Sequence, residues 1–240
     1  MTNIIFVGDS YCASTSTEHY AANGRQQFQD YKPYPGHPAI VADHYSVDLY
    51  TYGYSGKSWW YSYRKFQQAL HNNPGRLARA LAVVFFHTDA SRINSMNQEL
   101  TSWHLPQHFD HSPKRDPIDS ELAEASRSWA RHLYDIEFQD WAQQQYFMEL
   151  AREYKEVKTI HFHCFKHTVD YSDLLPGWVY TTPLYTISNS EPGEKRTVGD
   201  TRANHLNEQN NLALAQTIIH AIDRYTPGQY PIPLEGFDIV

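Results

Sequence analysis

Residues 81–86 read LAVVFF, a run of six apolar side chains without a charge or a turn residue. A strand covered on one face alternates apolar and polar residues, whereas a strand buried on both faces is apolar throughout. Strands buried on both faces are typical of parallel sheets, which carry helices on both sides. The run therefore predicts an internal strand of a parallel α/β sheet.

Other segments of the chain have the length and composition of strands, and helical patterns separate them. Further strands are expected at Asn3–Val7, Ser46–Thr51, Val157–Cys164 and Trp178–Thr182. Helices are expected at Pro38–His44, Trp59–His71, Asp119–His132, Asp135–Tyr154 and Leu206–Tyr225. This alternation predicts βαβ units in one α/β domain over residues 1–240, with a polar insertion around 90–118 and a tail at 226–240.

Apolar residues recur at helical spacing in the two longest predicted helices, so each helix is expected to bury one stripe. In Asp135–Tyr154 the stripe comprises Ile136, Phe138, Trp141, Tyr146, Phe147 and Leu150. In Leu206–Tyr225 it comprises Leu212, Leu214, Ala215, Ile218, Ile219 and Ile222.

The composition excludes several classes of partner. The net charge is −7 and no basic block occurs, so nucleic acid is not an expected partner. No apolar run approaches the roughly 18 residues of a membrane helix, and the interrupted N-terminal run is too short for a signal peptide.

With only Cys12 and Cys164, no disulfide framework is expected. A cytoplasmic location is expected, or a virion-associated one if the chain is phage-encoded, and a homo-oligomer is left open.

Ligands of parallel sheets bind outside the carboxyl ends of the strands, so the residues that follow each expected strand matter most. A Ser hydroxyl becomes a nucleophile when a His takes its proton, and a carboxylate orients that His. Fixed N–H or O–H donors then hold the oxyanion. Such residues follow the strands or precede the last helix: Gly8, Asp9, Ser10; Gly53, Ser55, Gly56, Lys57, Ser58; His87, Thr88, Asp89; His167, Asp170; Asp200, Arg202, Asn204, His205.

Four blocks, in this order, resemble those of the SGNH (GDSL-like) hydrolase family. They are FVGDSY (6–11), YGYSGKS (52–58), FFHTD (85–89) and NHLNEQNN (204–211). The resemblance implies a flavodoxin-like three-layer α/β/α sandwich with a mainly parallel sheet of about five strands. It also implies a serine esterase that works through an acyl-enzyme, without a metal or an organic cofactor.

The resemblance assigns roles to single residues. Ser10 matches the nucleophile and His205 the catalytic base, while the N–H groups of Ser10 and Gly56 match two oxyanion donors, with Gly53 as a competitor for Gly56. The residues expected to line the substrate site are Asp9, Tyr11, His87, Asp89, Trp59 and Asn204. Asp9 is interpreted mainly as a turn residue that places Ser10 at the edge of the sheet.

Two positions depart from the family pattern. Thr88 stands where the family has an Asn donor, and its hydroxyl is taken as the third oxyanion donor, with His87 as a second choice. Arg202 stands where the family has the Asp that orients the His. Asp200 is therefore predicted to orient His205, with a backbone carbonyl, Asp170 or Asp173 as alternatives.

The aromatic residues after Gly56 bear on the substrate. Trp59, Trp60, Tyr61 and Tyr63 follow it directly, and aromatic faces stack on sugar rings. A small-molecule or glycan ester is therefore expected, with O-acetyl carbohydrate favoured over other esters. Packing of the two tryptophans on the sheet is the alternative interpretation. A binding or structural protein that has kept the hydrolase fold without its chemistry is the alternative function.

Histidines gather in two short stretches and raise the alternative of a metal site. They are His161, His163 and His167 beside Cys164, and His104, His108 and His111 in the insertion. On a strand, however, His161 and His163 face one side and Cys164 the other. No metal site is therefore expected.

Overall fold

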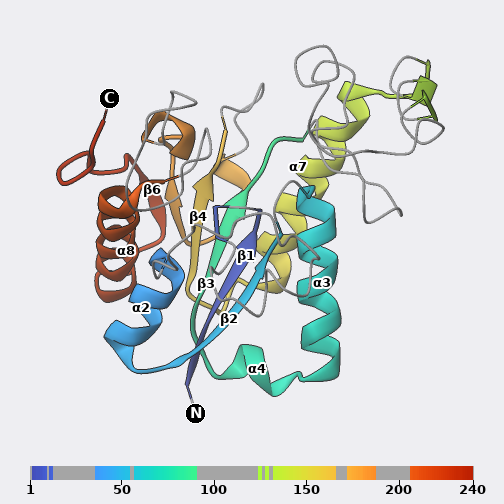
Figure 1. Ribbon diagram of the computed structural model, residues 1–240. Coiled ribbons are helices and arrows are strands. Elements are labelled where there is room, and N and C mark those ends of the chain that lie inside the picture. Colours follow the sequence, from blue (N-terminus) through green and yellow to red (C-terminus); the bar gives the residue numbers. More distant parts are fainter. Residues whose placement is uncertain are drawn as a thin grey trace.

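The computed structural model describes residues 2–9, 11–12, 36–54, 57–90, 124–125, 128–129, 132–165, 172–187 and 206–239. Within them the chain forms a six-stranded sheet in the order β2-β1-β3-β4-β5-β6 (Figure 1), and each neighbouring pair is parallel. The strands are β1 (Asn3–Gly8), β2 (Asp48–Gly53), β3 (Ala80–His87), β4 (Thr159–His163), β5 (Trp178–Tyr180) and β6 (Gly228–Tyr230). The predicted α/β class and all five predicted strands are confirmed, and the sheet has one strand more than expected.

Helices cover both faces of the sheet. They are α2 (His37–Tyr45), α3 (Trp59–Asn72), α4 (Gly75–Ala78), α7 (Ile136–Glu153) and α8 (Glu208–Asp223), with 3-10 turns η2 (Ser172–Leu174) and η3 (Leu184–Ile187). Figure 1 shows α2 and α8 on one face and α3 and α7 on the other. Four predicted helices are thereby confirmed, whereas most of the helix expected at Asp119–His132 and most of the insertion lie outside the described residues.

The run LAVVFF forms the centre of β3 and contributes to both apolar cores. Val84 and Phe86 pack with α2 and α8, while Val83 and Phe85 pack with α3 and α7. All four side chains are essentially inaccessible to solvent. The uninterrupted apolar run is therefore explained by burial on both faces.

The stripe predicted for α7 is only half correct. Tyr146, Phe147 and Leu150 are buried, but Phe138 and Trp141 are each 54% exposed. At about 100° per residue, Phe138 lies on the side of the helix opposite Phe147, and Trp141 on the side opposite Leu150. Ile136, also in the predicted stripe, is exposed as well, at the start of the helix. In α8 the prediction holds except for Leu212, which is exposed, and Ile219, which is partly buried.

The segment after β6 packs back along the domain. Asn210 of α8 is fully buried, and its amide oxygen accepts from Asp238 N at 2.6 Å while its amide nitrogen donates to Asp238 O at 3.0 Å. Asn207 Nδ2 also donates to Asp238 Oδ2 at 3.1 Å. Residues 234–239 are thereby held against the beginning of α8.

In the part of the chain that the structure describes, no helix combines the length and the apolar character needed to cross a membrane.

Candidate functional site

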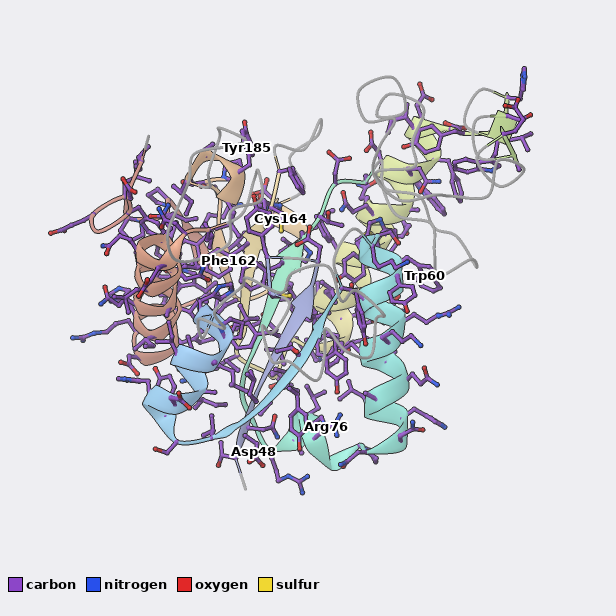
Figure 2. The ribbon with its side chains drawn as sticks, viewed as in Figure 1. Asp48, Trp60, Arg76, Phe162, Cys164 and Tyr185 are labelled. Atoms are coloured by element: carbon purple, nitrogen blue, oxygen red, sulfur yellow. The ribbon has the colours of Figure 1, made fainter. Side chains whose placement is uncertain are left out.

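The candidate site lies at the carboxyl edge of the sheet, where β1 and β3 are neighbours. The chain leaves β1 for β2 on one side and leaves β3 for β4 on the other, so a crevice between their ends is expected. Figure 2 shows Cys164 and Tyr185 at this edge, and Asp48 and Arg76 at the opposite end. The carboxyl ends of β1, β2 and β3, which the predicted site residues follow, therefore lie at one edge of the sheet.

Gly8, the last residue of β1, is required by the close approach of β1 to β3. A Cβ at this position would lie 2.6 Å from both the Cβ and the carbonyl oxygen of Phe86. The Gly8 carbonyl accepts from Tyr54 N at 3.2 Å and from the hydroxyl of Ser62 in α3. The end of β1 is thereby fixed to β2, β3 and α3 at once.

Asp9 turns inward at the end of β1. Its side chain is fully buried, and Oδ1 accepts from Tyr11 N at 3.0 Å and from Cys164 Sγ at 3.5 Å. The bond to Tyr11, two residues on, is that of an Asx turn. This arrangement agrees with the interpretation of Asp9 as a turn residue. Tyr11 is also buried, with its ring in edge contact with Phe165.

Gly53, the last residue of β2, is the competitor of Gly56 for the second oxyanion donor. Tyr54 N–H points to β1, because it donates to Gly8 O, and N–H groups alternate in direction along a strand. The N–H of Gly53 therefore points away from β1, at the edge strand of the sheet. This leaves Gly56 as the candidate donor, and it lies outside the described residues between Tyr54 and Lys57.

Thr88 follows β3 and is buried to 1% exposure. Its backbone carbonyl accepts from Gln143 Nε2 of α7 at 2.8 Å. Its hydroxyl Oγ1 is buried and has no hydrogen-bond partner within the described residues. Buried polar groups are nearly always paired, and a catalytic role is one explanation for such a hydroxyl at the edge of a sheet.

The side chain of His87 points to the face of the sheet that α3 and α7 cover. Its Nε2 lies 2.9 Å from Nδ1 of His161, and its ring packs against Phe147 at 4.6 Å between ring centres. Burial and, to a smaller extent, nearby His163 lower the pKa of His161 to about 3, so His161 is neutral at pH 7. Because His87 is bound to His161, the geometry favours Thr88 over His87 as an oxyanion donor.

His163, at the end of β4, forms a second buried pair. Its Nε2 lies 3.0 Å from Ser172 Oγ in η2, and both side chains are buried. As predicted, His161 and His163 share a face, while Cys164 belongs to the other core. Over the described ranges of the chain, no group of three or more His, Cys, Asp or Glu side chains could hold a metal ion.

The beginning of α8 lies at the same edge. Asn210 Nδ2 donates to Ile187 O at 2.7 Å, so the residues on either side of segment 188–205 are held together. Asn211 Nδ2 donates to Leu206 O at 3.0 Å, and Asn207 caps the helix by accepting from Asn210 N at 2.7 Å. The residue that follows His205 in the chain is thus fixed in place.

The two tryptophans of α3 lie in different surroundings. Trp59 is buried, and its ring stacks on Tyr146 at 4.8 Å with an interplanar angle of 18°. Trp60 is 45% exposed, near the end of α3 that lies at the carboxyl edge (Figure 2). One face of the Trp59 ring is therefore occupied by Tyr146, and Trp60 is the exposed ring of the pair.

Several predicted site residues lie outside the described residues: Ser10, Gly56, Asp170, Asp200, Asn204 and His205. Asp89 is half-buried after β3, and its charge raises the pKa values of Tyr134 and Asp140 in addition to the larger effect of burial. Asp173 is exposed, and its carboxylate accepts from Gln229 of β6. Gln229 pairs with Val179, and Val179 with His161, so Asp173 lies below the carboxyl edge of the sheet.

Two residues of the site were not predicted from the sequence. Ser62 binds the end of β1, and Gln143 binds the end of β3. Gln143 precedes the buried pair Tyr146 and Phe147 by three and four residues, so it lies on the buried stripe of α7. A polar residue on such a stripe is the signal that could have identified it.

Comparison of the chain with protein-family models, with curated proteins and with solved structures gives no match.

Proposed function

We propose that this chain is a serine esterase that uses Ser10 as the nucleophile and His205 as the general base. The observation that carries the proposal is the Thr88 hydroxyl, which is buried directly after β3 and has no hydrogen-bond partner among the residues that the structure describes. An oxyanion hole consists of donors that are fixed before the substrate arrives and that have no other partner. Thr88 fits that description, and its carbonyl is held by Gln143.

The register of the sheet supports the pairing of Ser10 with Thr88. Val7 of β1 pairs with Phe85 of β3, and Ser10 and Thr88 each follow those residues by three positions. The ends of β1 and β3 therefore lie level with each other at the carboxyl edge of the sheet, which supports roles for Ser10 and Thr88 in one site.

The proposed mechanism is acyl transfer to water. His205 takes the proton of Ser10 as the hydroxyl attacks the ester carbonyl, and the oxyanion is held by Ser10 N–H, Gly56 N–H and the Thr88 hydroxyl. The protonated His205 then gives its proton to the departing alcohol. Water hydrolyses the acyl-enzyme in the reverse sense, with His205 again acting as base. Asp200 is the proposed orienting carboxylate, and Asp173 is less favoured because of its place beside β6.

The test is the hydrolysis of p-nitrophenyl acetate by the wild type, Ser10→Ala and His205→Ala. We expect a burst of p-nitrophenol in the wild type, no burst in Ser10→Ala, and a rate at least about 10³-fold lower in both variants. Ser172→Ala is the matched control, because Ser172 also bonds to a buried histidine but lies in η2.

The rates of the wild type and the three variants distinguish the proposed esterase from its alternatives. Activity that is retained in Ser10→Ala would overturn the proposal. A loss in Ser172→Ala instead would assign the chemistry to the pair Ser172 and His163. Background rates in every protein would favour a binding or structural protein with the hydrolase fold.

A further inference from the structure

A cluster of aromatic rings and ammonium groups lies where β2 ends and α3 begins. Tyr54 and Tyr61 meet edge to face, with ring centres 5.1 Å apart and an interplanar angle of 82°. Lys57 Nζ lies 5.4 Å and Lys65 Nζ 5.7 Å from the centre of the Tyr61 ring. We call Tyr54, Lys57 and Tyr61 the aromatic–lysine corner.

This corner adjoins the candidate site through the backbone. Tyr54 N donates to the carbonyl of Gly8, two residues before Ser10, and Tyr54 O accepts from Lys57 N at 3.2 Å. Lys57 directly follows Gly56, the proposed oxyanion donor. The corner therefore lies beside the backbone that leads to the proposed oxyanion donor.

The chemistry of the corner indicates an anionic sugar. Tyr54 and Tyr61 are partly exposed and provide apolar surface on which a sugar ring can pack, and an ammonium group provides donors to an anion. The chain as a whole carries a charge of −7, so its overall field repels anions. An anionic ligand must then be held by a local cation, and Lys57 is the cation nearest in sequence to the proposed oxyanion hole.

We propose that the aromatic–lysine corner is a subsite for an anionic saccharide whose acetyl ester is the substrate of this site. This inference rests on the proposed function and adds the class of substrate. Lys57 binds the anionic group, and the ring of Tyr54 or Tyr61 packs against the sugar.

The test compares esters that differ in one group. The substrates are O-acetylated methyl glucuronide, O-acetylated methyl glucoside and O-acetylated methyl glucoside 6-sulfate, with acetate release as the readout. We expect kcat/KM for the glucuronide to exceed that for the glucoside about tenfold, and the difference to shrink as salt is added. A preference for the sulfate ester over the glucuronide would assign the corner to sulfated sugars.

Lys57→Gln and Lys65→Gln form a matched pair of variants. Each removes one ammonium at a similar distance from the Tyr61 ring, but Lys65 lies one helical turn beyond Tyr61, away from the start of α3. We expect Lys57→Gln to abolish the preference by raising KM for the anionic ester, and Lys65→Gln to retain it. Equal kcat/KM for glucuronide and glucoside in the wild type, or equal losses in the two variants, would overturn the proposal.

A binding measurement separates this proposal from the proposed function. Unacetylated methyl glucuronide is titrated into the wild type and into Lys57→Gln in a calorimeter. Salt-sensitive binding that is lost in Lys57→Gln would support the subsite even if no ester is hydrolysed. Hydrolysis of p-nitrophenyl acetate without any binding of the glucuronide would leave the esterase standing and remove the subsite.

Discussion

The side-chain amide nitrogen of Gln143 lies 2.8 Å from the backbone carbonyl oxygen of Thr88. This contact joins α7 to the end of β3 across residues that are far apart in the sequence. Replacing Gln143 by Ala would leave the buried carbonyl of Thr88 without its donor, so we expect the free energy of unfolding to fall by about 1–3 kcal/mol. If Thr88 acts in the oxyanion hole, kcat falls as well, while KM changes little.

Gln67→Ala is the control for Gln143→Ala. Gln67 of α3 likewise donates from its side-chain amide, to the hydroxyls of Tyr63 in α3 and of Tyr154 directly after α7, but these contacts belong to the core below the edge. Urea denaturation gives the stability of both variants, and ester hydrolysis gives their kcat. Equal loss of kcat in the two variants would contradict a positioning role for Gln143.

Thr88→Val removes a hydroxyl and keeps the shape of the side chain. Since Oγ1 has no partner within the described residues, its loss should leave stability unchanged or raise it by up to about 1 kcal/mol. The loss of an oxyanion donor should lower kcat on the order of 10²-fold. A variant that is stable yet slow is the expected outcome, measured by thermal denaturation and by ester hydrolysis.

Thr217→Val provides the comparison. The hydroxyl of Thr217 is also buried, but it donates to Ala213 O at 2.9 Å. This variant should lose stability and keep its activity. The prediction for Thr88 fails if Thr88→Val is destabilised as much as Thr217→Val, or if its kcat is unchanged.

Gly8→Ala should destabilise the protein by about 1–3 kcal/mol, because the new methyl group would overlap backbone and side-chain atoms of Phe86. Gly75→Ala in α4 is the control, since its Cβ would meet only the Arg79 side chain at 3.5 Å or more. That change should be neutral or slightly stabilising. Chemical denaturation of both variants tests the difference, and equal stabilities would show that β1 and β3 can separate without cost.

Acid should weaken the fold through the buried histidines. His37 packs against Phe6 and Phe86, and burial lowers its pKa to about 4, opposed by its hydrogen bond to Asn211. Its folded pKa is below the unfolded value, so its contribution to stability is complete above about pH 6.5 and declines as the pH falls toward 4. In that window, each unit by which the pH falls lowers the free energy of unfolding by up to about 1.4 kcal/mol.

The measurement is urea denaturation at pH 7 and pH 5 for the wild type and His37→Gln. The variant should be less stable at pH 7 but should lose less stability between the two pH values. An identical pH dependence in both proteins would show that His37 does not titrate in this way.

The strands were predictable because burial on both faces demands uninterrupted apolar runs, as in β1 and β3. β6 was missed because Gly228, Gln229 and Tyr230 form a three-residue edge strand of which no residue is fully buried, so no apolar run marks it. Periodicity assigned Phe138 and Trp141 to the stripe of α7, although they lie on the opposite side of the helix from the buried residues. Spacing identifies a face only when every member is checked against the period of about 3.6 residues.

For the candidate site, the sequence predicted which loops meet but not the detailed contacts. Positions after parallel strands converge by topology, which is why Asp9 and Thr88 were identified. The inward turn of Asp9 and the pairing of His87 with His161 depend on neighbours far along the chain, which no local pattern encodes. Trp59 likewise packs on Tyr146 because α3 and α7 are adjacent, which the sequence does not state.

Cys12 and Cys164 approach Asp9 from different parts of the chain. Cys12 Sγ lies 3.6 Å from Asp9 O, Cys164 Sγ lies 3.5 Å from Asp9 Oδ1, and both thiols are fully buried. Burial, reinforced by the charge of Asp9, raises the pKa of Cys12, so this thiol resists alkylation while the end of β1 stays closed. The rate at which iodoacetamide modifies the native protein therefore measures how often the end of β1 opens, and this measurement needs no substrate.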